Sequence, residues 1–378
     1  MRVLIISASA GAGHTRAAQA LEEALRLLCP DCQSQHVDIL DFASATYKKT
    51  YADGYLQMVN RAPALWGALY SATDRLRRRK IEERFLRLFD KVEFAPFRSF
   101  VRDFAPDAVL ATHFLPIQVF ASYREKGLDG FPFGLVLTDY DAHAFWVQPS
   151  ADRFFVASDE LQAVLAGRGI PAERIAVTGI PIMQSFTVTH DRAVVRKDLN
   201  LTPGVPTVLV MAGGAGVGDF EETVRTVLAC RPVQVIAVAG RNEALRRRLL
   251  ELVVPDRTAL RVFGFVDEIA KLMTASDVAV AKCGGLTTAE CLATGLPIVV
   301  RDPIPGQEER NADYLLEAGA GIKAHGVDPL RFKLGKLLAD PDRIQQMRAA
   351  ARRVRRPDAA REIIEKMLSP WGAPARNT

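Results

Sequence analysis

The chain has 378 residues, of which 49% are hydrophobic and 25% charged, and its formal net charge is +5. These proportions are those of a globular protein and exclude an intrinsically disordered or collagen-like chain. The apolar runs stop far short of the roughly 18 residues that a membrane-spanning helix needs, and no secretory signal pattern is expected. Five cysteines, an odd number, favour a reducing compartment over a disulfide framework.

The positive charge is concentrated in two segments. Residues 75–102 hold ten Lys and Arg against four Asp and Glu, and residues 331–366 hold eleven against five. Basic segments of this kind favour an anionic partner, such as a nucleic acid, a membrane surface or a phosphorylated ligand. Two solvated helix faces would give the same counts. No RNA- or DNA-binding motif accompanies the segments, so we expect no nucleic-acid partner.

Strand and helix patterns alternate along the first half of the chain. Residues 2–7 are typical of a strand, and apolar residues then recur at helical spacing from Ala17 to Leu28, before Pro30 ends the helix. The aromatic and basic stretch 42–104 interrupts the rhythm, and we interpret it as two or three inserted helices. Further strands are predicted at 107–111, 133–137, 153–156 and 175–177.

The same plan starts again at residue 207, after the proline-containing segment 181–206. A strand over 207–212 leads into a glycine-rich loop and a helix over 219–229. Closing helices begin at 328. Between them we predict strands at 233–239, 260–263, 277–281 and 297–300, and helices at 243–253, 267–275 and 287–294.

This alternation predicts an α/β protein with two doubly wound, Rossmann-like domains that face each other across a cleft. We place an N-terminal domain at 1–185 with the helical insertion 42–104, and a C-terminal domain at 200–340. Residues 341–378 would form closing helices and a tail. Ligands of such folds bind at the carboxyl ends of the strands, where both glycine-rich loops fall.

The two glycine-rich loops are weak signals when taken alone. The loop at 11–16 and the loop at 214–219 lack the third glycine of a dinucleotide fingerprint, and neither has the Gly-Lys-Ser/Thr of a Walker A motif. Both retain backbone N–H groups that can approach an anion at a helix N-terminus, although tight turns also explain such glycines. His14 lies at a helix N-terminus, which favours its neutral form, so it is either a base or a helix cap.

Polar side chains follow two further strands of the first domain. Asp139 and Asp141 form an Asp-x-Asp pattern that could hold a divalent metal on a sugar nucleotide. We prefer a polar cluster that lines the cleft together with His143 and Trp146. His113 follows the strand 107–111 and occupies an equivalent place.

Residues 282–311 are the most informative segment. Gly284 and Gly285 precede a helix for which Thr287 or Thr288 is the expected N-cap. In its first turns, Glu290 could accept hydrogen bonds from two ribose hydroxyls. The proline-stiffened loop at 302–311 then offers donors and acceptors suited to sugar hydroxyls, namely Gln307, Glu308 and Asn311.

These motifs resemble, in the same order, those of the monogalactosyldiacylglycerol synthase and processive diacylglycerol glucosyltransferase family. The resemblance covers roughly residues 2–325, and a more distant one links the chain to the peptidoglycan glycosyltransferase that uses UDP-N-acetylglucosamine. One departure is Cys283, where the family usually has Pro. The matching segments are Ser7–His14 with Ala17 and Ala18, Thr138-Asp139 with His143 and Trp146, Val177–Ile182, Gly284–Thr287 with Glu290, and Pro303–Asn311.

The resemblance implies a GT-B fold whose C-terminal domain binds a UDP-sugar and whose N-terminal domain binds a lipid acceptor. It implies an inverting, metal-independent transfer of glucose or galactose to diacylglycerol, with no cofactor. The implied catalytic residues are His14, as the base, and Asp139. The implied donor-binding residues are Gly213, Gly214, Phe265, Val266, Gly284, Gly285, Leu286, Thr287, Glu290, Gln307, Glu308 and Asn311. The implied acceptor-binding residues are Gly13, Trp66, His113, His143 and Trp146.

We therefore expect a peripheral enzyme on the cytoplasmic face of an anionic membrane, with both basic segments near the lipid. Two alternatives stay open: a UDP-sugar 2-epimerase-like enzyme, and a non-catalytic sensor of UDP-sugar or lipid with the same fold. The sequence does not choose between glucose and galactose. Cys29 and Cys32 form a Cys-x-x-Cys at a helix end, where no helix N-terminus stabilises a thiolate, so we expect neither a redox nor a metal role.

Overall fold

A computed structural model describes residues 1–9, 11–49, 67, 93–124, 130–212, 220–230, 232–254 and 259–369. Most of the predicted insertion 42–104, including Trp66, lies outside the described residues, as does the loop that contains Gly213 and Gly214. In the part of the chain that is described, no helix combines the length and the apolar character required to cross a bilayer.

The first half forms a six-stranded parallel sheet in the order β2-β1-β3-β4-β5-β6. Its strands are β1 (Arg2–Ser7), β2 (Gln33–Asp38), β3 (Ala108–Ala111), β4 (Phe133–Val136), β5 (Arg153–Val156) and β6 (Ile175–Val177). Its longer helices are α1 (Ala12–Leu28), α5 (Ala95–Phe104), α6 (Phe114–Arg124) and α7 (Asp159–Gly167). The sequence analysis missed β2, because this edge strand is polar and keeps several side chains in solvent.

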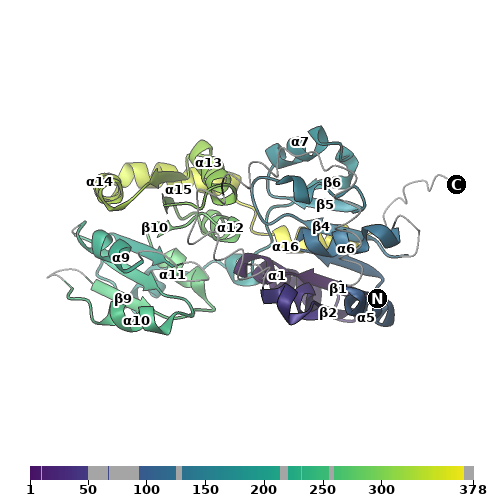
Figure 1. The fold of residues 1–378 in the computed structure, drawn as a ribbon. Coiled ribbons are helices and arrows are strands. Elements are labelled where there is room, and N and C mark those ends of the chain that lie inside the picture. The colour runs from purple at the N-terminus through teal and green to yellow at the C-terminus, as the bar shows by residue number, and fades with distance from the viewer. Residues whose placement is uncertain are drawn as a thin grey trace.

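The second half repeats the plan with the order β12-β11-β10-β7-β8-β9. Its strands are β7 (Thr207–Met211), β8 (Gln234–Val238), β9 (Ala259–Phe263), β10 (Val278–Ala281), β11 (Ile298–Arg301) and β12 (Gly321–Ala324). Its helices are α9 (Phe220–Leu228), α10 (Glu243–Leu250), α11 (Ile269–Ala275), α12 (Gly285–Thr294), α13 (Gln307–Glu317), α14 (Val327–Leu338) and α15 (Pro341–Val354). Figure 1 shows the two sheets in separate lobes, each covered by helices, which confirms the predicted doubly wound class.

The last described helix, α16 (Ala359–Leu368), returns to the first lobe. Its apolar side chains Ile363, Ile364 and Met367 share a core with Leu21 and Leu25 of α1. The chain therefore crosses between the lobes twice, once after β6 and once after α15. The two crossings touch at Gly179, where an added Cβ would lie 2.4 Å from the Cβ of Arg356.

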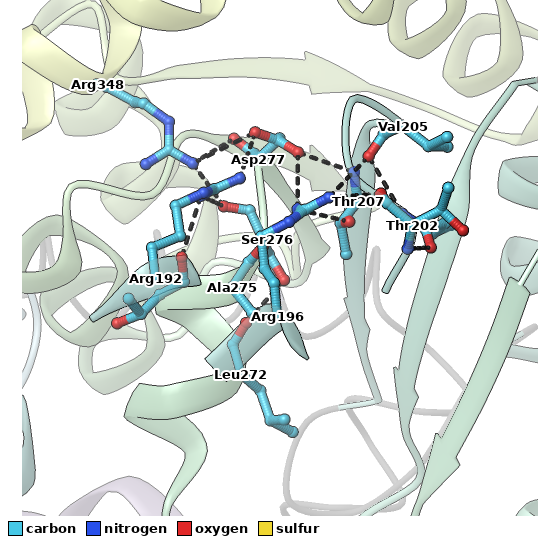
Figure 2. A network of polar contacts seen from close by, with 12 residues as sticks. Arg192, Arg196, Thr202, Val205, Thr207, Leu272, Ala275, Ser276, Asp277 and Arg348 are labelled. Carbon is cyan, nitrogen blue, oxygen red and sulfur yellow. Dashed lines mark hydrogen bonds and ion pairs between the residues drawn. The ribbon is translucent and has the colours of Figure 1, made fainter. Parts of the chain in front are cut away.

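The linker helix α8 (Arg192–Asp198) is fixed to the second lobe by the polar network of Figure 2. Arg192 Nη2 donates to Asp277 Oδ1 (2.7 Å), and Arg196 Nη1 donates to the carbonyl of Ala275 (2.9 Å). Arg348, from α15, donates to the carbonyl of Ser276 at the same place. Three guanidinium groups thus gather where α11 ends, and cations there suit its dipole.

Cys29 and Cys32 form a disulfide where α1 ends, and their Cα atoms lie 5.3 Å apart. The cysteine count did not lead us to expect this bond. The other cysteines, Cys230, Cys283 and Cys291, are buried and free, in keeping with their small apolar side chains.

The two lobes meet where the loop after β4 touches the first turns of α12 and α13. A Cβ on Gly285 would lie 1.9 Å from the carbonyl oxygen of Thr138, so only glycine permits this approach. Beside it, Tyr140 stacks on Tyr314 with ring centroids 4.2 Å apart. This contact brings the strand ends of both sheets together.

Gly285→Ala should therefore push α12 away from Thr138. We expect a loss of about 1–3 kcal/mol in the free energy of unfolding, the usual cost of overpacking. The matched control is Gly284→Ala, because a Cβ at Gly284 meets nothing within 4 Å and the backbone φ is −65°. Denaturant titrations of both variants check this, and equal stabilities would contradict it.

Candidate active site

His14 occupies the first turn of α1 and is fixed by residues that follow β3 and β4. Its Nδ1 lies 2.8 Å from the carbonyl oxygen of Thr112 and 3.0 Å from Thr138 Oγ1. Because a carbonyl only accepts, Nδ1 carries the proton. The Thr112 hydroxyl in turn donates to the His14 carbonyl (2.8 Å). In the neutral ring, Nε2 is therefore the bare, basic nitrogen.

The electrostatics around His14 keep it neutral before a reaction and can stabilise its charged form afterwards. Protein atoms surround the ring although part of its surface stays open, and this desolvation lowers its pKa below the usual value. The nearby Asp139 carboxylate opposes the shift, as does the hydrogen bond to Thr112. If Nε2 takes up a proton, the nearby Asp139 carboxylate would stabilise the positive charge of the ring.

Asp139 is held in place by groups of the other lobe. Desolvation raises the pKa of its carboxyl, while the Asn311 amide, His14 and the Gly285 N–H favour the ionised form. Asn311 Nδ2 donates to Asp139 Oδ1 (2.8 Å). The neighbouring Asp141 instead forms an ion pair with Arg310, with Oδ2 3.2 Å from Arg310 Nε. The two carboxylates of the Asp-x-Asp pattern thus have different partners.

Asn311 uses its amide within the protein. Besides the bond to Asp139, its Nδ2 donates to the carbonyl of Cys283 (3.0 Å) and its Oδ1 accepts from the Tyr140 N–H (2.8 Å). The side chain is fully buried. Asn311 therefore connects the two lobes and orients Asp139. A contact between Asn311 and the sugar donor stays a prediction.

Aromatic rings form one wall beside His14. His113 meets it edge to face with ring centroids 4.7 Å apart, and Trp146 lies at 6.3 Å. His113 Nδ1 accepts from the Leu115 N–H (3.1 Å), and burial holds its pKa well below the usual value. The neutral His113 ring therefore adds no positive charge beside His14.

His143 lies next to these aromatic rings. Its Nδ1 accepts from the Phe145 N–H (3.3 Å), and it precedes the short 3-10 helix η2 (Ala144–Trp146). The ring is buried. His143 therefore positions Trp146, and its predicted contact with the acceptor stays untested.

On the second lobe, α12 begins at Gly285 with Gly284 as the N-cap. The predicted N-cap, Thr287 or Thr288, is wrong. The Thr288 hydroxyl instead donates back to the Gly284 carbonyl (3.0 Å), inside the first turn. Gly284 has no side chain that could cap α12, and the Gly285 N–H donates instead to Asp139 of the other lobe. Buried Cys283 contacts Thr288 Oγ1 through Sγ at 3.2 Å.

Two buried carboxylates lie on the second lobe, among the predicted donor-binding residues. Glu290 is 8% exposed, and burial raises its pKa to about 7, an effect that Arg16 opposes. Within the described residues its oxygens accept no hydrogen bond, so both stay available for hydroxyl groups. Glu308 is also buried, with its pKa raised, and its Oε2 accepts from the Ile304 N–H (2.7 Å).

The other predicted donor-binding residues that the structure describes also lie on the second lobe. Phe265 is half exposed and has the Arg241 guanidinium 5.0 Å from its ring centroid, while Val266 is partly buried beside it. Leu286 of α12 faces Gly13 of α1. Gln307 is the first residue of α13, and Thr287 lies in the first turn of α12.

Sequence reasoning missed three contributors. Thr112 and Thr138 fix the ring of His14, and Arg16 faces Glu290 from the other lobe. Thr138 belongs to the Thr138-Asp139 motif but was given no role, and for Thr112 a polar residue at a strand end was the only local signal. Nothing local marks Arg16, because its partner lies on a helix of the second lobe.

The fold is that of GT-B glycosyltransferases. MurG of Acinetobacter baumannii superposes with a TM-score of 0.61 at 15% identity, covering 97% of this chain and 99% of that one. UGT2 of Phytolacca americana gives a TM-score of 0.63 at 12% identity over 98% and 99%. A UDP-GlcNAc 2-epimerase from Neisseria meningitidis gives 0.60 at 13% identity over 98% and 100%. At these identities the likeness shows the fold alone.

Sequence comparison identifies the family. Residues 14–182 match the monogalactosyldiacylglycerol (MGDG) synthase family, and residues 207–363 match the glycosyltransferase family 28 C-terminal domain. The processive diacylglycerol beta-glucosyltransferases of Bacillus mycoides (strain KBAB4) and Bacillus cereus (strain AH187) are each 30% identical over 376 residues, which is 97% of this chain and 93% of theirs. The chain therefore belongs to the MGDG synthase and processive diacylglycerol glucosyltransferase family.

Glu290→Gln should stabilise the unliganded protein above pH 7. Burial raises the pKa of this carboxyl from 4.5 to about 7. Below pH 4.5 the group therefore does not lower the free energy of unfolding. The cost grows as the pH rises to 7 and then stays at about 3 kcal/mol. Denaturant unfolding should show the variant to be more stable at pH 8 and nearly unchanged at pH 4. The exposed Glu317→Gln is the control, and an equal effect at both pH values would contradict the prediction.

Proposed function

We propose that this chain transfers a hexose from a UDP-sugar to the free hydroxyl of diacylglycerol and so makes a membrane glycolipid. The family and the names of the 30% identical relatives support this substrate pair. The observation that carries the chemistry is the fixed, neutral His14, whose proton lies on Nδ1 and whose Nε2 is free to accept one.

In the proposed reaction His14 Nε2 takes the proton of the acceptor hydroxyl as that oxygen attacks C1 of the sugar. The bond from C1 to the diphosphate oxygen breaks, UDP leaves with the bonding electrons, and the configuration at C1 inverts. Asp139 stabilises the imidazolium that results. The leaving diphosphate would lie at the N-terminus of α12, where the helix dipole and the N–H groups of the first turn other than that of Gly285 would stabilise its charge.

The donor side suits a UDP-hexose. Glu290 would accept the two ribose hydroxyls, Phe265 would lie at the base, and Gln307 and Glu308 would contact the hexose. The relatives' names favour glucose as the sugar and a β-linked product. UDP-galactose is the competing donor, and mass analysis of the lipid product with each donor decides between them.

His14→Ala should lower turnover by about 10²–10⁴-fold, the usual contribution of general base catalysis, while UDP still binds. The measurement is transfer of labelled hexose to diacylglycerol in mixed micelles, with UDP affinity measured by calorimetry. His325→Ala is the matched control, because that side chain is 61% exposed and has no predicted role in the reaction. Retained turnover, or loss of UDP binding alone, would assign His14 a structural role.

The same assay separates the rival functions. An epimerase would convert the UDP-sugar with no lipid present, and its fold relatives include such enzymes. A sensor would bind UDP tightly and neither transfer nor hydrolyse the sugar. Formation of a glycolipid that requires both substrates excludes both.

We also propose that the enzyme works as a peripheral protein on the anionic, cytoplasmic face of a membrane. The basic segment 331–366 is described throughout. In it, Phe332 is 70% exposed and lies between exposed Arg331 and Lys333 on α14. Exposed lysine and arginine side chains next to an apolar ring suit the surface of an anionic bilayer.

Lys336→Gln should weaken binding to vesicles that contain anionic lipid by about five-fold, since each cation near the surface contributes ~1 kcal/mol. High salt should weaken binding of both proteins. The control is Lys197→Gln on α8, which removes the same charge from another exposed position. Co-sedimentation that ignores lipid charge and salt would refute the proposal.

A further inference from the structure

The helices that carry the catalytic and the donor residues face each other across the junction. Gly13 of α1 lies against Leu286 of α12, with a Cβ-to-Cβ distance of 4.0 Å for a side chain added at Gly13. Arg16 follows Gly13 by three residues, and Glu290 follows Leu286 by four. Residues at these spacings share a helix face, so Arg16 and Glu290 lie on the two facing sides.

Arg16 and Glu290 interact through space without an ion pair. The positive charge of Arg16 favours the ionised form of Glu290, yet no guanidinium nitrogen lies within 4.0 Å of the carboxylate. Within the described residues, the carboxylate also accepts no hydrogen bond. Its oxygens therefore remain open to a ligand while the guanidinium stabilises their charge from a distance.

Other charged groups around α12 do not have this effect on Glu290. Cys291 lies beside it with a buried thiol. The helices packed against α12 carry Lys271 on α11, Glu308, Arg310 and Asp313 on α13, and Arg348 and Arg352 on α15. Among the described residues, Arg16 is the one charged group that shifts Glu290, and it belongs to the other lobe.

We propose that Arg16 is a positioning residue for the donor nucleotide: from the facing side of α1, its guanidinium favours the charged Glu290 carboxylate as the acceptor for the two ribose hydroxyls. Charged acceptors form stronger hydrogen bonds than neutral carboxylic acids do. Since Arg16 sits two residues after His14, nucleotide affinity depends on the same approach of the lobes that places the base. This inference rests on the proposed function, because it takes Glu290 to bind the ribose of a UDP-sugar.

The test is the affinity for UDP as a function of pH in the wild type and in Arg16→Gln. Loss of the guanidinium should move the midpoint of Glu290 ionisation up by roughly one pH unit. The variant should then bind UDP about five-fold more weakly at pH 7 but less than two-fold more weakly at pH 8.5. The ratio of the two proteins' constants cancels the titration of UDP itself.

Controls separate the proposal from its rivals. Arg16→Lys should restore the wild-type profile, and Arg16→Gln should have no further effect in a Glu290→Gln background. A loss that is the same at every pH and is seen with UDP but not with uridine would mean that Arg16 contacts phosphate, and would overturn the proposal. If Glu290→Gln leaves UDP binding unchanged, the proposed donor site fails; if only the shift is absent, this inference alone fails.

Discussion

The site depends on one close contact, the approach of the Thr138 carbonyl to α12 at Gly285. Any side chain at this position would separate the sheets. The contact brings the Gly285 N–H and the Asn311 amide to Asp139, and Asp139 in turn acts on His14. It also sets α1 against α12, which places Arg16 opposite Glu290. The proposed base, the Asp139 carboxylate beside it and the proposed donor-binding carboxylate thus share one geometric requirement.

The same contact makes the site electrostatically costly. His14, Asp139, Glu290 and Glu308 are all surrounded by protein, and desolvation is the largest influence on the pKa of each. Desolvation disfavours a charged side chain unless a partner offsets it. Asp139 has such partners, whereas Glu290 accepts no hydrogen bond among the described residues. A protein that keeps such a group has given up stability for binding, as functional sites commonly do.

Much of the fold followed from the sequence, because buried parallel strands are short apolar runs separated by amphipathic helices. The failures have local causes. The edge strands β2 and β12 were missed, because β2 is polar and β12 is a short strand that contains a glycine and a lysine. The N-cap of α12 is Gly284 and not a threonine, since Thr288 bonds within the first turn. His14, Glu290 and the glycines were proposed from their motif, and their roles stay predictions. The contact of Asn311 with Asp139, 172 residues away, could not be predicted, since no local pattern encodes such a contact.

The central claim is that His14 is a neutral base whose proton is held on Nδ1 by the Thr112 carbonyl. Nitrogen-15 NMR of the histidine-labelled protein, titrated with pH, tests it most directly, with His14→Gln to assign the signal. The account predicts a neutral ring at pH 7 that is protonated on Nδ1 and has a pKa below about 6.5. A ring that carries its proton on Nε2, or an imidazolium at pH 7, would contradict it.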